Sequence, residues 1–107
     1  MPSPLVNRYA VYFQLDRDAK VAKAISRHTS FLVAVESCLA AYRETGHMGF
    51  RIEDVRRHRE FRLNRTLVLR VMLLKSQNEP LYFDIMNRLD RSGGQREMES
   101  YLADHAI

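Results

Sequence analysis

The sequence has one cysteine and no long apolar run. Cys38 stands alone among 107 residues, so the chain cannot form an internal disulfide. No apolar run reaches the eighteen residues typical of a membrane-spanning helix, and the first residues lack the charged and apolar segments of a secretion signal. We therefore expect a protein of a reducing, cytoplasmic compartment that does not cross a membrane.

Motifs for metals, cofactors and nucleophilic catalysis are also missing. Gly93–Gly94 is the only glycine pair and is typical of a helix end, so there is no glycine-rich phosphate loop. Four scattered histidines do not pair with each other or with cysteine at zinc-ligand spacing: His28, His47, His58 and His105. We expect no cofactor and no metal. His28 and Cys38 lie among apolar neighbours, which favours a hydrogen-bonded histidine and an inert thiol.

The composition is that of an ordinary soluble domain. Hydrophobic residues make up 46% of the chain and charged residues 28%, and the length is close to the commonest size of one domain. Residues 1–107 are therefore expected to form a single domain.

The first half of the chain indicates a strand followed by a long helix. In "RYAVYFQLD", Tyr9, Val11, Phe13 and Leu15 alternate with more polar residues, which is typical of a half-buried strand. From Val21 to Tyr42 the apolar positions recur every three or four residues, which predicts one helix over residues 18–44 that ends at Gly46. Thr29 and Ser30 could instead cap a second helix, so one helix or two remains open.

The middle of the chain has apolar residues at every second position. This pattern predicts two strands, near residues 50–62 and 66–75, joined as a hairpin at Asn64 and Arg65. The second strand, "TLVLRVMLL", is apolar on both faces, as in a central strand, whereas the first is rich in arginine, as in a solvated edge strand.

Two helices are expected at the end of the chain. Asn78 is a good N-cap, and Leu81, Ile85 and Leu89 form an apolar stripe that stops at the glycine pair. A last helix from Gln95 places three apolar residues on one face, Met98, Tyr101 and Leu102. The predicted fold is a small α+β domain of order β-α-β-β-α-α, with an antiparallel sheet of about three strands, a long helix and a C-terminal helical pair.

An alternative topology comes from comparing the two halves of the chain. "YAVYFQLD" precedes "SFLVAVESCLAAY", and "LVLRVMLL" precedes "GQREMESYLADHA", an order of elements that resembles a tandem pair of the ribbon-helix-helix family. The resemblance implies DNA binding through a two-stranded ribbon in the major groove. The segment that would form the second ribbon is largely apolar where a ribbon that reads the groove should be polar, which argues against this alternative.

One segment holds a large share of the positive charge. "RIEDVRRHREFRLNR", residues 51–65, contains six of the fourteen arginines and three acidic residues, a local charge of +3 out of a total of +4. If this segment formed one continuous strand, both faces of the strand would be basic. Arginine, which outnumbers lysine fourteen to three, binds phosphate oxygens with two parallel hydrogen bonds. The candidate nucleic-acid-binding residues are therefore Arg51, Arg56, Arg57, Arg59, Arg62 and Arg65.

These arginines favour a non-enzymatic protein that binds nucleic acid in an accessory or regulatory role. Duplex DNA is the first choice of partner and RNA the second. Stacking on single strands is poorly supported, because Phe61 has the parity of the buried residues and only Tyr12 is expected on the outer face. A homodimer is expected, since a three-stranded sheet leaves apolar edges.

Other interpretations of the same residues remain open. The arginines could belong to a solvated edge strand, paired with Glu53, Asp54 and Glu60, or could dock an adaptor or inhibitor onto an acidic protein partner. A small metal-dependent nuclease would use Asp16 or Asp18, just after the first strand, although the simpler role of these two residues is to cap a helix.

Overall fold

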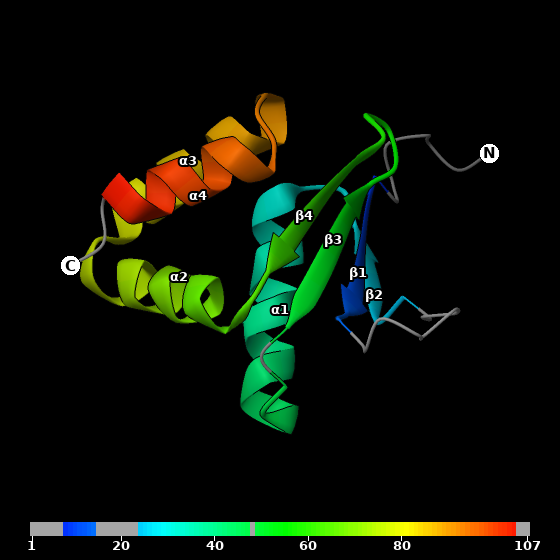
Figure 1. Cartoon of the computed structure of the whole chain (residues 1–107), viewed down its shortest axis with the longest axis horizontal. Helices are drawn as coiled ribbons and strands as arrows, with labels where there is room; N and C mark the ends of the chain where they lie inside the picture. Colours follow the sequence, from blue (N-terminus) through cyan, green and yellow to red (C-terminus); the bar gives the residue numbers. More distant parts are fainter. Residues whose placement is uncertain (1–7, 15–23, 48, 105–107) are drawn as a thin grey trace.

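The computed structural model describes residues 8–14, 24–47 and 49–104, and these form an α+β fold with one antiparallel sheet (Figure 1). The sheet has four strands in the order β2-β1-β3-β4. The strands are β1 (Tyr9–Phe13), β2 (Ser26–His28), β3 (Phe50–Asp54) and β4 (Arg59–Leu63), and the helices are α1 (Phe31–Thr45), α2 (Arg65–Gln77), α3 (Glu79–Arg91) and α4 (Gln95–Asp104). The predicted fold class is confirmed, with one more strand and one more helix than expected.

The helices lie on one side of the sheet. Helix α1 packs against β1, β2 and β3, while α2 and α4 contact β4 (Figure 1). Alternation along each strand sends every second side chain toward these helices, and the buried apolar members of this inner face are Tyr9, Val11, Phe50, Ile52, Phe61 and Leu63. The other face of the sheet is polar.

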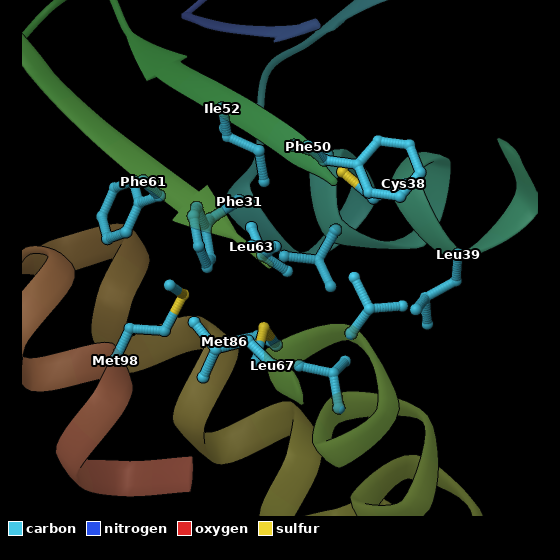
Figure 2. Packing of buried hydrophobic residues seen from close by; sticks show 14 of the residues in the cluster. Phe31, Cys38, Leu39, Phe50, Ile52, Phe61, Leu63, Leu67, Met86 and Met98 are labelled. Atoms are coloured by element: carbon cyan, nitrogen blue, oxygen red, sulfur yellow. The ribbon is translucent and has the colours of Figure 1, made fainter. Parts of the chain in front are cut away.

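The hydrophobic core fills the space between the inner face and the helices. Figure 2 shows Phe31 of α1 beside Phe61 of β4, whose ring centroids are 4.6 Å apart, with Met86 of α3 and Met98 of α4 pointing toward them. The core therefore combines side chains from the sheet and from all four helices into one apolar cluster.

The prediction of one helix over residues 18–44 is wrong for residues 24–30, the described part of its first half. Residues Ser26–His28 form a strand that pairs with β1. Helix α1 begins only at Phe31, where the side chain of Ser30 accepts a hydrogen bond from the Val33 backbone N–H at 3.2 Å, and it ends as expected at Gly46. The cap foreseen as an alternative at Ser30 is confirmed, but a strand precedes it.

The strand expected over residues 66–75 is wrong, because this segment is helix α2. Asn64 was expected in a hairpin turn, but it is the N-cap of α2 and accepts a hydrogen bond from the Leu67 backbone N–H at 2.9 Å. The buried residues of α2 follow helical spacing: Leu67, Val68, Val71 and Leu74. The tandem ribbon-helix-helix alternative is excluded with it, since that alternative needs a strand here.

The hairpin of the structure lies earlier in the chain than expected. Residues 50–62 do not form one continuous strand, because the chain turns at residues 55–58 and returns as β4. His58 closes this turn with a φ of 55°, a left-handed conformation. The turn falls inside the arginine-rich segment and divides it between two strands.

The two expected C-terminal helices are confirmed. Asn78 caps α3 by accepting a hydrogen bond from the Leu81 backbone N–H at 3.3 Å, and α4 begins at Gln95 after the glycine pair. Met98 and Leu102 of α4 are buried, as their spacing predicts.

Candidate nucleic-acid interface

The six candidate arginines lie in four different settings along the β3–β4 hairpin. Arg51 and Arg62 face each other across β3 and β4, whereas Arg56 and Arg57 belong to the turn. Arg59 is on the inner side of β4, and Arg65 begins α2. The expectation of a strand that is basic on both faces is therefore wrong, because only one face of the hairpin is free of the core.

We use the term outer face for the surface of the sheet that points away from the helices. Cross-strand pairing aligns Tyr12, Arg51 and Arg62 in one row on this face. A second row begins on the short strand β2 and consists of Arg27, Ala10, Glu53 and Glu60. Three arginines and two glutamates give the outer face a net charge of +1. The place of Arg27 on this face was not predicted, because residues 26–28 were expected to be helical.

The guanidinium of Arg51 is held from two sides. It lies 4.3 Å from the ring centroid of Tyr12, a cation–π contact, and its Nη1 lies 3.2 Å from Oε1 of Glu60. The other carboxylate oxygen of Glu60 lies 3.6 Å from Nη2 of Arg62. One glutamate thus bridges the two arginines of the row and offsets part of their charge.

The turn of the hairpin carries two of the six candidate arginines. Arg56 is exposed and Arg57 is half-buried, and neither makes a salt bridge among the described residues. Asp54 shapes the turn by accepting a hydrogen bond from the Arg57 backbone N–H at 3.2 Å. This hydrogen bond constrains the backbone of the turn that carries both arginines.

Asp54 was a possible partner of the neighbouring arginines, but it pairs instead with Arg8, 46 residues away in sequence. Nε and Nη2 of Arg8 donate to the two carboxylate oxygens of Asp54 at 3.3 and 3.2 Å, and Nη2 also donates to the backbone carbonyl of Asp90 at 2.8 Å. Burial alone would lower the pKa of Arg8, but its hydrogen bond to Asp54 and the nearby charges raise it overall. Asp90 in turn caps α1 by accepting from the Phe31 backbone N–H at 2.9 Å.

Arg59 has a structural partner on the helical side of the molecule. Its Nη1 donates to the backbone carbonyl of Gly93, in the loop between α3 and α4. Beside it, the side-chain amide of Gln95 bonds both backbone groups of Arg62, with Oε1 accepting at 2.6 Å and Nε2 donating at 2.9 Å. The contact with Gly93 gives the Arg59 side chain a structural role that needs no ligand. Arg65 is exposed at the start of α2.

Two shallow depressions open near the ends of the strands. One, of about 450 Å³, lies beside Arg62, Asn64, Gln95 and Glu99, and the other, of about 420 Å³, lies beside Phe13 and His47. Phe13 and His47 pack edge to face with ring centroids 4.8 Å apart. The first depression is thus lined mainly by polar side chains, and the second mainly by the rings of Phe13 and His47.

The other titratable residues singled out in the sequence occupy structural positions. Burial raises the pKa of the Cys38 thiol to about 12 and lowers the pKa of His28, whose Nε2 lies 2.8 Å from the Ser26 hydroxyl. Asp16, Asp18 and His105 fall outside the described residues. Across the part of the chain that is described, no three histidine, cysteine or acidic side chains come together as a metal site would require.

Within the same ranges, no helix has the length and apolar character to cross a membrane.

Comparison with protein-family models, curated proteins and solved structures gave no match to this chain.

Proposed function

We propose that this protein binds nucleic acid, with duplex DNA as the first choice of partner and RNA as the second, in a non-enzymatic accessory or regulatory role. The observation that carries the proposal is the arrangement of arginines on the β3–β4 hairpin and its neighbours. Arg51 and Arg62 lie on the outer face and Arg56 and Arg57 at the turn, so two adjacent strands and the turn between them carry all four. Arg27 extends the same face onto β2.

The outer face is a surface of four strands, because β1 pairs with β3 along the whole length of β3 and the hairpin does not stand free as a ribbon. Neighbouring strands lie about 4.8 Å apart, so Arg51 and Arg62 can contact the phosphate backbone of one duplex laid across this face. In this arrangement the arginines of the turn reach further phosphates. Release of counterions from the phosphates would supply most of the affinity.

The experiment that tests the proposal is a salt series of binding to random duplex DNA, duplex RNA and single strands. Each phosphate contact in B-DNA contributes about 0.9 to the slope of log affinity against log salt concentration. Replacing two phosphate-binding arginines in Arg56→Ala/Arg57→Ala should therefore lower the slope by about 1.8.

The matched control removes the same charge elsewhere. Arg43 at the end of α1 and Arg96 in α4 are exposed and lie outside the hairpin, so Arg43→Ala/Arg96→Ala should leave the slope nearly unchanged. Binding that is weak and insensitive to salt for every polymer would refute the proposal. Tight binding to polyglutamate without binding to any nucleic acid would instead support an adaptor that docks on an acidic protein.

The homodimer is part of the same proposal. Helix α2 exposes Leu69 and Leu73 one turn apart, at 41% and 39%, and these offer apolar surface to a second copy. Sedimentation equilibrium over a range of concentrations tests the dimer, and a constant mass of one chain would exclude it.

A further inference from the structure

We propose that the space between Arg51 and Arg62 is a subsite for one phosphate of the nucleic-acid partner, and that the carboxylate of Glu60 occupies it in the free protein. The identity of the ligand rests on the proposed function. The existence of an anion subsite rests on the geometry alone.

The contacts of Glu60 are those of a bridging anion. Its Oε1 lies 3.2 Å from Nη1 of Arg51, and its Oε2 lies 3.6 Å from Nη2 of Arg62. The two arginines come from adjacent strands and are directly opposite each other in the register, so both can reach one anion above the sheet. A phosphodiester also offers two anionic oxygens to such a pair.

Arg51 is oriented toward this subsite before a ligand arrives. The Tyr12 ring, 4.3 Å from the guanidinium carbon, limits the directions that the Arg51 side chain can take. Because less conformational entropy is lost on binding, a preorganised arginine binds a phosphate more tightly than a freely rotating one.

The carboxylate of Glu60 can leave the subsite at small cost. The side chains of Glu60 and Arg51 are about one third exposed and that of Arg62 is two thirds exposed, at 35%, 32% and 66%. Ion pairs in such solvated positions contribute little to stability. A polymer that brings phosphates to several arginines at once can therefore displace Glu60, whereas a single small anion gains less from the exchange.

Glu60 thus acts as an internal competitor that weakens loose binding of anions. The chain provides a matched control for this role in Glu53, which lies directly opposite Glu60 on the same face. Within the described residues Glu53 makes no salt bridge. Both residues carry the same charge over the same surface, but only Glu60 bridges the two arginines.

The test compares Glu60→Gln with Glu53→Gln at one fixed salt concentration, using two probes, a random DNA duplex and tripolyphosphate. If Glu60 occupies the subsite, Glu60→Gln should raise affinity for both probes about fivefold, because its exposed ion pairs no longer compete with the ligand. Glu53→Gln, which changes only the long-range field, should raise it about twofold. In an Arg62→Ala background the gain from Glu60→Gln should shrink, because half of the subsite is gone. Circular dichroism confirms that each variant is folded.

The outcomes separate this inference from the proposed function. Equal gains for Glu60→Gln and Glu53→Gln would overturn the subsite and leave DNA binding intact. A selective gain for tripolyphosphate without any binding to nucleic acid would support the subsite and overturn the proposed function. An unchanged gain in the Arg62→Ala background would also count against the bridging geometry.

Discussion

At the scale of single residues, the guanidinium of Arg8 lies between two aspartates although only 8% of the residue is exposed. Asp54, with 2% exposure, ends β3, and Asp90 lies near the end of α3 and caps α1. The Arg8 side chain therefore connects the residue before β1 with the end of β3 and with α3, and Asp90 extends the connection to α1. Removing one partner of such a buried group leaves the opposite charge without compensation.

We expect Arg8→Met to lower the free energy of unfolding by about 3 kcal/mol, because Asp54 would remain buried without its partner. Urea denaturation followed by circular dichroism measures the loss. The control is Arg62→Met, whose side chain is 66% exposed and whose ion pair should contribute less than about 1 kcal/mol. Losses of similar, small size in both variants would contradict a structural role for Arg8.

Cys38 makes stability depend on alkaline pH. Its pKa is raised from 9.0 to about 12 by burial, so the thiol ionises in the unfolded chain before it ionises in the folded protein. Its contribution to stability is full below pH 9 and is lost as the pH rises toward 12, at no more than about 1.4 kcal/mol per pH unit. Burial raises the pKa of Tyr9 and of Tyr82 in the same direction, which adds to the alkaline loss.

We therefore expect the stability difference between the natural protein and Cys38→Ala to move in favour of the variant as the pH rises from 8 to 10.5. Urea denaturation at several pH values gives this difference. If the two curves of stability against pH run parallel, the thiol is not protected in the way that its burial indicates.

At the scale of secondary-structure elements, the start of α2 depends on the side chain of Asn64. Asn64→Ala removes the acceptor for the Leu67 backbone N–H and should lower the free energy of unfolding by about 1 kcal/mol. Asn64→Asp keeps an acceptor and should retain most of the stability. Chemical denaturation compares the three proteins, and an equal loss in both variants would argue against capping.

Helix α2 also explains why the sequence misled the prediction. Its apolar residues occupy both odd and even positions, so a period of two and a helical period fit equally well. The distinction requires knowledge of which residues are buried, and Leu69 and Leu73, which completed the alternating pattern, are about 40% exposed. By contrast, β1, α3 and α4 each carry one clear period, with the Asn78 cap and the glycine pair marking the bounds of the two helices, and their positions were predicted.

Strand β2 could not be predicted from local sequence. Its three residues, Ser26–His28, contain no apolar side chain and are extended because they pair with β1.

The candidate site could be predicted only in part from the sequence. Charge density pointed to Arg51, Arg56 and Arg62, but the carbonyl that binds Arg59 belongs to a loop 34 residues away. The binding role of these arginines stays a prediction.

At the scale of the whole molecule, the shared core favours unfolding in one step. The sheet and all four helices contribute to the same apolar cluster, and α4 inserts Met98 and Leu102 at 1% and 2% exposure. We expect far-ultraviolet and near-ultraviolet circular dichroism to report the same transition midpoint in urea. Two separate midpoints would contradict the single domain expected for residues 1–107.

The same core makes the last helix indispensable. A chain that ends at Gly94 would lose Met98 and Leu102 and expose the apolar residues that they cover, so its cooperative transition should disappear. A sharp transition in that shortened chain, observed by the same two signals, would show that α4 is an accessory to the fold.

The side chain of Gln95 has a consequence for how the sheet ends. Its amide group bonds the outward-facing N–H and C=O of Arg62 in β4, as the peptide group of a fifth strand would. A strand of another molecule that approached this side would find the two groups at Arg62 already satisfied. Proteins commonly protect exposed strands in such ways, because an open row of backbone groups templates the pairing that leads to aggregates and fibrils.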